Sequence, residues 1–317
     1  MPLHSLPVEV LYLILQFVGS DSLRKHNACC LLVSKWWYKL AEPVMLQELV
    51  LNANQLNQIP DKAVEKLTVY LQRLRILMPH TSNWHADDQL NDVFSQFLPR
   101  CPRLKAFGLR APSDFDPENP FAPATNYLES WSPTGLFDTL DSSAISDLVI
   151  DTSGSKFQSG VHICPQILKI PSLRSARIRM HNVCPRLLDL EQDSKIESLI
   201  INLSLKEPDR FHAGYSRHCT EPKSAYDLYD EMVVAATAVT KTHPGIKLLR
   251  ILCHKHPYLE IVTSDCIEGT KRILSDESQD WSDDGLPDPD DAELSDRDLF
   301  TADSEDEAPA TLAYPLN

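Results

Sequence analysis

Two short segments of the sequence place histidine and cysteine close enough together to suggest metal binding. They are His162-Ile163-Cys164 and Cys253-His254-Lys255-His256. Imidazole and thiolate groups are common zinc ligands, but a zinc site generally needs about four ligands. Neither segment has a second pair of ligands at the spacing of a zinc-binding motif, so we expect no metal site and no cofactor.

The sequence also lacks the motifs of the common enzyme classes. It contains no GxxxxGK[ST] or GxGxxG for phosphate binding, no HExxH for zinc hydrolysis and no GxSxG nucleophile motif. Only nine glycines are present to form the tight loops that catalytic sites often need. We therefore expect no catalytic residues and a protein that is not itself an enzyme.

The negative charge of the chain is concentrated at its C-terminus. The formal net charge is −15, and residues 275–317 hold fifteen Asp and Glu against one basic residue, which leaves the rest nearly neutral. A nearly neutral body argues against binding nucleic acid through a broad basic face. Dense like charges repel and there is little apolar surface, so we predict a disordered acidic tail over 275–317.

Cysteine usage and hydropathy indicate the compartment. Eight cysteines without a CxxC pair are too few for a disulfide scaffold, which favours an intracellular protein, cytoplasmic or nuclear or both. The apolar N-terminal run is interrupted by Glu9 and Gln16, and it is too short for a membrane span of about 18 residues. We expect no signal peptide and no membrane partner.

The first 45 residues are predicted to form three short helices. The first runs from Val8 to Val18 and ends at Gly19, the second lies near Leu23, and the third ends before Pro43. Helices of this size cannot bury all their large apolar side chains among themselves. We therefore expect this unit to dock on a partner, on the rest of the chain, or on both.

The same residues resemble an F-box. The resemblance rests on Leu6-Pro7-Val8-Glu9, on the pair Ile14-Leu15, and on a later segment that begins Val33-Ser34-Lys35 and ends in Leu40-Ala41. F-box proteins are substrate receptors of SCF-type cullin–RING ubiquitin ligases and bind a Skp-type adaptor. The resemblance implies an adaptor-binding surface that comprises Leu6, Pro7, Val10, Ile14, Leu15, Val33 and Trp37.

A second interpretation of the N-terminal unit remains open. The three helices could instead pack on the protein's own body, in a scaffold or interaction module that works without a ligase. Side-chain exposure distinguishes the two interpretations. Complete burial of Ile14, Leu15 and Trp37 within the chain would exclude adaptor binding through this unit.

Residues 46–274 repeat a leucine-rich pattern. The segment from Leu46 to Leu56 matches LxxLxLxxNxL at every specified position, and its core LxxLx[LI] recurs in complete or weaker form. The copies begin at residues 46, 71, 101, 145, 173, 196 and 246, and four of the six intervals are between 23 and 30 residues. We predict an α/β fold, an irregular leucine-rich-repeat-like solenoid after the F-box; an ordinary α/β domain with a parallel sheet is the alternative.

Two long loops and one strand are the predicted contacts of an unknown protein substrate. The loop at 112–144 is rich in proline and aromatic residues, and the loop at 206–225 is basic and suited to the acidic tail or an acidic partner. Three arginines alternate with apolar residues and predict a basic stripe along one strand. The predicted substrate-binding residues are Arg174, Arg177, Arg179, Tyr127 and Trp131.

Overall fold

The fold was analysed in a computed structural model of the chain. It describes residues 6–25, 34–56, 58–78, 88–111, 128, 131–152, 155–158, 161–205, 214–254, 260–274 and 286–287. Val33 and Tyr127, both predicted site residues, lie outside the described residues.

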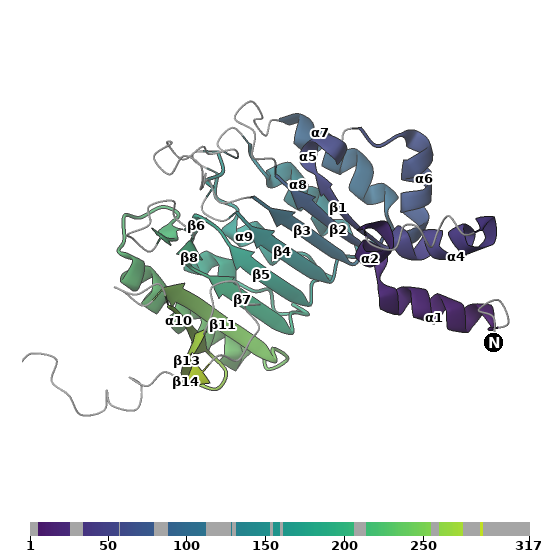
Figure 1. The fold of residues 1–317 in the computed structure, drawn as a ribbon. Helices are drawn as coiled ribbons and strands as arrows, with labels where there is room; N and C mark the ends of the chain where they lie inside the picture. Colours follow the sequence, from purple (N-terminus) through teal and green to yellow (C-terminus); the bar gives the residue numbers. More distant parts are fainter. Residues whose placement is uncertain are drawn as a thin grey trace, which may run out of the picture.

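The protein is mixed α/β and is built on one ten-stranded, mostly parallel sheet (Figure 1). The first seven strands lie side by side in chain order and are parallel: β1 (Glu48–Asn52), β2 (Arg73–Leu77), β3 (Ala106–Arg110), β4 (Asp147–Asp151), β5 (Ser175–Arg179), β7 (Ser198–Asn202) and β11 (Leu248–His254). The last three are antiparallel: β12 (Ile261–Asp265), β13 (Thr270–Leu274) and β14 (Leu286–Pro287).

Helices connect the strands and cover one face of the sheet (Figure 1). They are α5 (Ala53–Leu56), α6 (Asp61–Tyr70), α7 (Asp88–Phe97), η2 (Leu98–Arg100), α8 (Thr134–Asp141), α9 (Cys164–Ile167), η3 (Pro185–Leu188) and α10 (Ala225–Thr242). Two short ladders, β6 (Asn182–Val183) with β10 (Arg217–His218) and β8 (Ser204–Leu205) with β9 (Gly214–Tyr215), complete the body. The N-terminal unit consists of α1 (Val8–Val18), α2 (Ser20–Lys25) and α4 (Lys35–Met45).

Two in-register rows of apolar side chains form the core under the helices. One row comprises Leu49, Leu74, Phe107, Leu148, Ala176, Leu199 and Leu249. The next comprises Leu51, Ile76, Leu109, Ile150, Ile178, Ile201 and Ile251. Helix residues such as Leu67, Phe94 and Met232 pack against these rows in a single cluster. Because side chains alternate along a strand, the residues between them face away from the helices.

The seven copies of the leucine pattern precede or enter the seven parallel strands. In six of the predicted copies, the third apolar residue lies in a strand and is aligned with its counterparts in the neighbouring strands. The copy predicted at residue 101 is misplaced by three residues, because Leu104, Phe107 and Leu109 are the ones that align with Leu71, Leu74 and Ile76. Phe107 takes the middle position in this copy, as Ala176 does in the copy at residue 173.

The predicted loop at 112–144 is shorter than expected. Residues 112–127, 129 and 130 lie outside the described residues, but Thr134–Asp141 form α8. Trp131 has no exposed surface and contacts Phe94 and Phe157. The prediction of Trp131 as a substrate contact is therefore wrong, because its indole belongs to the core between α7, α8 and the sheet.

The predicted basic loop at 206–225 is also partly ordered into strands. Residues 206–213 lie outside the described residues. Gly214–Tyr215 forms β9, which pairs with β8, and Arg217–His218 forms β10, which pairs with β6. In the tail, Leu286–Pro287 pairs with Ile273 and Arg272 as β14, so these two residues are not disordered. The remaining residues of 275–317 lie outside the described residues.

Within the described part of the chain, no helix has both the length and the apolar character needed to cross a membrane.

Candidate functional site

The N-terminal unit has a small core of its own. Leu15 of α1, Leu23 of α2, and Ala41 and Val44 of α4 pack together and are buried. Gly19 ends α1 with a positive φ of 82°, a conformation that favours glycine, and its N–H donates to the carbonyl of Leu15. This chain reversal is what brings α2 and α4 back against α1.

Helix α4 ends later than the sequence predicts. The Ser34 hydroxyl accepts a hydrogen bond from the Trp37 N–H and caps the helix, which continues through Pro43 to Met45. The expectation that this helix ends before Pro43 is therefore wrong. Side chains of α4 connect the unit to the body, because Glu42 forms an ion pair with Lys66 of α6.

One side of α1 remains uncovered and apolar. Phe17 is 95% exposed, Leu13 is 63% exposed and Ile14 is 42% exposed, although all three are large hydrophobic residues. Further apolar residues exposed on the unit are Val8, Val10, Trp36 and Tyr38. We call Val10, Leu13, Ile14 and Phe17, which share one side of α1, the apolar N-terminal surface. Figure 1 shows α1 projecting from the first-strand end of the sheet, away from the helices that cover the core.

The predicted adaptor-binding residues divide between this exposed side and the unit's core. Pro7, Val10 and Ile14 are exposed, and Leu6 and Trp37 are half-buried. Leu15 is buried against α2 and α4, so its prediction as a surface residue is wrong. Ile14 and Trp37 are not completely buried. The condition that would exclude adaptor binding through this unit is therefore not met.

Sequence reasoning missed Leu13 and Phe17, the two most exposed large apolar residues among those described in the N-terminal unit. The signal was present, because a helix that is apolar on nearly all sides exposes whatever its neighbours fail to cover. Leu11 and Leu15, which are four residues apart, are the buried side. Leu13 and Phe17, which are also four apart, consequently lie on another side.

The three predicted arginines lie in three different environments, and only Arg177 and Arg179 are part of β5, on the face of the sheet opposite the helices. Arg179 is buried and donates to both carboxylate oxygens of Asp151, at 2.8 and 2.7 Å. Arg174 is exposed and donates to Glu197 at 2.7 Å, while Arg177 is half-buried. The predicted stripe is therefore not one continuous basic surface, and Arg179 is unavailable to a substrate.

Glu197 offsets the basic charge beside β5. It accepts hydrogen bonds from Lys247 at 2.5 Å and from Arg174 at 2.7 Å. Hydrogen bonding from Lys247, together with that from Arg174, lowers the pKa of the Glu197 carboxyl below its usual value. The carboxylate therefore stays ionised and shares its charge between the two cations.

A hollow of about 370 Å³ lies on the same face, over β1 to β4. Three arginines (Arg24 of α2, Arg73 and Arg75) and two carboxylates (Glu48 and Asp147) line it together with Gly108, and Arg73 pairs with Glu48 at 3.0 Å. A Cβ atom at Gly108 would lie 3.4 Å from Cγ of Arg75, so a larger residue would fill this space. The sequence-based search did not find this hollow because its arginines come from separate segments.

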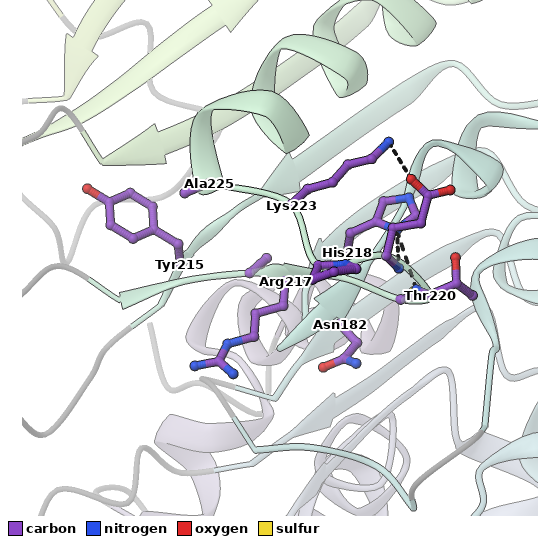
Figure 2. Close-up of a pocket in the computed structure, with 11 residues that line it drawn as sticks. Asn182, Tyr215, Arg217, His218, Thr220, Lys223 and Ala225 are labelled. Carbon is purple, nitrogen blue, oxygen red and sulfur yellow. Dashed lines mark hydrogen bonds and ion pairs between the residues drawn. The ribbon is translucent and has the colours of Figure 1, made fainter.

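A second hollow, of about 670 Å³, borders β10 and the start of α10 (Figure 2). Figure 2 shows Lys223 and Arg217 extending in different directions, and the His218 ring beside the backbone of Thr220. Lys223 pairs with Glu231 at 2.5 Å and with Glu221 at 2.9 Å. Hydrogen bonding to these carboxylates raises the pKa of Lys223 to about 12, so its positive charge is already compensated. This compensation weakens the predicted attraction for an acidic partner.

One cluster of side chains could hold a metal ion. The ligand atoms of His162, Cys164, Cys184 and Cys219 all lie within 4.8 Å of one another. Hydrogen bonding from Cys164 lowers the pKa of the Cys184 thiol well below its usual value, and that same interaction raises the pKa of Cys164. We expected no metal site because His162 and Cys164 lacked a second pair of ligands, and the fold supplies that pair.

Comparison with known proteins gives no identification: no protein-family model matches the chain, and no curated protein matches it.

Proposed function

We propose that the protein is a non-catalytic substrate receptor of an SCF-type cullin–RING ubiquitin ligase. The observation that carries the proposal is the apolar N-terminal surface, which lies on the segment that resembles an F-box. In this proposal α1 and α4 bind a Skp-type adaptor, and the sheet domain binds a protein substrate.

The energetics of the apolar N-terminal surface support a protein partner. Burying one large apolar side chain contributes about 1.5–3 kcal/mol, and contiguous exposed apolar patches often mark protein interfaces. Phe17 and Leu13 together expose most of their side chains to water. A partner that covers these two residues and Ile14 gains the favourable free energy of burying apolar surface, which the chain's own fold does not bury.

The arrangement of the body supports irregular leucine-rich repeats. Seven parallel strands follow one another in chain order, and apolar residues occupy matching register positions in each. In such repeats the face opposite the helices is the usual binding surface. The hollow lined by Arg73 and Arg75 is our candidate for the substrate contact. Its three arginines outnumber its two carboxylates, which favours an acidic segment of the substrate.

The proposed receptor contributes to ubiquitin transfer through proximity. It holds the substrate near a conjugating enzyme that other subunits supply, which raises the effective concentration of the reacting groups. This role needs two binding surfaces on one rigid chain and no catalytic side chain.

A binding assay with purified Skp-type adaptor tests the proposal. Phe17→Asp places a charge on the most exposed part of the apolar N-terminal surface, and we expect it to weaken adaptor binding at least about tenfold. Leu6→Ala with Pro7→Ala tests the residues that carry the resemblance. The matched control is Val234→Asp on α10, because Val234 is 70% exposed but lies on another surface. We expect the control to bind the adaptor as the unmodified protein does.

The opposite result would favour the ligase-independent scaffold. If the folded, unmodified protein binds no Skp-type adaptor at micromolar concentrations, the proposal is wrong. Equal binding by Phe17→Asp, by Leu6→Ala with Pro7→Ala and by Val234→Asp would show that adaptor capture does not use the apolar N-terminal surface.

A further inference from the structure

The four residues of the metal-ligand cluster come from three connections that follow consecutive strands. His162 and Cys164 lie after β4, where the chain enters α9. Cys184 lies after β5, between β6 and η3, and Cys219 lies after β7, directly beyond β10. The carboxyl ends of parallel strands meet at one edge of the sheet, so the fold gathers residues that are far apart in sequence.

The distances within the cluster fit a tetrahedral ion. Two sulfurs bound to one zinc ion at ~2.3 Å each lie roughly 3.8 Å apart, and a sulfur and an imidazole nitrogen lie slightly closer. The sulfurs of Cys164 and Cys219 are 3.5 Å apart. Nε2 of His162 is 3.1 Å from the sulfur of Cys184. These two pairs widen by a few tenths of an ångström around a zinc ion, and the separations of up to 4.8 Å among the ligand atoms contract.

The backbone positions the ligands independently of any ion. Pro165 directly follows Cys164 in the first turn of α9, and Pro185 directly follows Cys184 at the start of η3. The connection that carries Cys219 is anchored next to it, because the N–H of Arg217 donates to the carbonyl of His181 at 2.7 Å. These hydrogen bonds and proline-fixed turns reduce the conformational entropy that ligand ordering would otherwise cost.

The composition of the cluster selects the metal and its role. Three thiols and one imidazole are a common structural zinc set, whereas magnesium and calcium prefer oxygen ligands. Cys164 and Cys184 are buried, and His162 and Cys219 are half-buried. Four protein ligands close the coordination sphere, so no position remains for a reacting water molecule.

We propose that His162, Cys164, Cys184 and Cys219 bind one zinc ion that holds together the connections after β4, β5 and β7. The ion releases the thiol protons to solvent on binding and changes no oxidation state. It also fixes the segment that begins at Cys219, which lines the hollow of Figure 2. This site is independent of adaptor binding, because the N-terminal unit lies beside β1 and the cluster follows the fourth to sixth strands of the sheet.

Metal analysis of the full chain tests the proposal. We expect the protein, purified under reducing conditions without chelator, to contain about one zinc ion per chain by elemental mass spectrometry. Cys184→Ser and Cys219→Ser should each lose it. The matched control is Cys101→Ser, because Cys101 is also buried but lies outside the cluster, and it should retain the zinc.

Cobalt substitution keeps the test valid if a cysteine variant fails to fold. Chelator-treated, unmodified protein should bind Co²⁺ with the strong visible absorption of tetrahedral coordination and a near-ultraviolet thiolate charge-transfer band. Chelator treatment should lower its thermal midpoint by roughly 5 °C or more, and zinc should restore it. A protein that binds neither zinc nor cobalt in this form overturns the proposal. So does a Cys164–Cys219 disulfide in the protein as isolated, or iron in place of zinc.

Discussion

At the scale of single residues, a buried ion pair joins Arg179 of β5 to Asp151 of β4. Both side chains are less than 10% exposed, and the contact is bidentate. Removing two charges from water is expensive, and their mutual attraction offsets that cost only while both are present. Arg110 also reaches Asp151, but its side chain is 57% exposed and the distance is 3.8 Å.

Arg179→Met should therefore lower the free energy of unfolding by about 3 kcal/mol, because it leaves the Asp151 carboxylate buried without its main partner. Arg110→Ala, which removes the exposed partner, should cost less than about 1 kcal/mol. Denaturant unfolding measures both values. In the double variant Arg179→Met with Asp151→Leu, part of the lost stability should return, because no charge remains buried. Equal losses for Arg179→Met and Arg110→Ala would refute this account.

At the scale of elements, Trp131 connects two helices and one strand. Its indole N–H donates to Oδ1 of Asn91 in α7 at 3.0 Å, and the Asn91 amide donates to the carbonyl of Ser132 just before α8. The ring also contacts Phe94, which in turn stacks edge-to-face on Phe107 of β3. The residue predicted to bind a substrate instead holds α7 and α8 on the sheet.

Trp131→Ala should destabilise the protein by about 3–5 kcal/mol, because it opens a large cavity and leaves the Asn91 amide oxygen unsatisfied. Trp131→Phe should cost less, since it retains most of the apolar volume. Thermal or denaturant unfolding gives the two losses. Adaptor binding by the folded Trp131→Phe variant should equal that of the unmodified protein. A Trp131→Ala variant as stable as the unmodified protein would contradict the assignment of Trp131 to the core.

Elements with a strong local pattern could be predicted from the sequence. Helix α1 has the predicted bounds, because its apolar run and Gly19 are neighbours in the chain. The leucine pattern predicts the register of six of the seven parallel strands and misplaces the copy near Phe107 by three residues. The end of α4 is misplaced, because Pro43 suggests a stop although the helix continues through it to Met45.

Residues that depend on tertiary neighbours could not be predicted. Alternation along β5 correctly separates Arg177 and Arg179 from the core side chains, but it carries no information that Asp151 of β4 covers Arg179. Likewise, only the order of the strands in the sheet brings His162 and Cys219 close together. Local spacing cannot find such a cluster, since the connections between its members exceed the spacing of known short motifs.

At the scale of the whole molecule, the two ends of the sheet are completed in different ways. At the first end, the N-terminal unit continues into β1 through Leu46 and Gln47, and the Gln47 amide donates to the Tyr12 hydroxyl of α1 at 2.8 Å. At the other end, β12, β13 and β14 add antiparallel strands to β11. A separate apolar cluster of Ile200, Leu252, Ile261 and Leu274 packs there on the face opposite the helices. The antiparallel strands thus protect the last parallel strand from water and from pairing with other chains.

Two truncations test this role of the antiparallel strands. Removing residues 255–317 takes away β12 to β14, exposes Ile200 and Leu252, and leaves the edge of β11 unpaired, so we expect aggregation on size-exclusion chromatography. Removing only residues 288–317 leaves every described element in place and deletes ten acidic residues and one basic residue, so the free energy of unfolding should change by less than about 0.5 kcal/mol. A monomeric, stable 1–254 fragment would show that the parallel strands and their helices need no antiparallel closure. A large loss of stability on removing 288–317 would instead show that the acidic segment packs on the body.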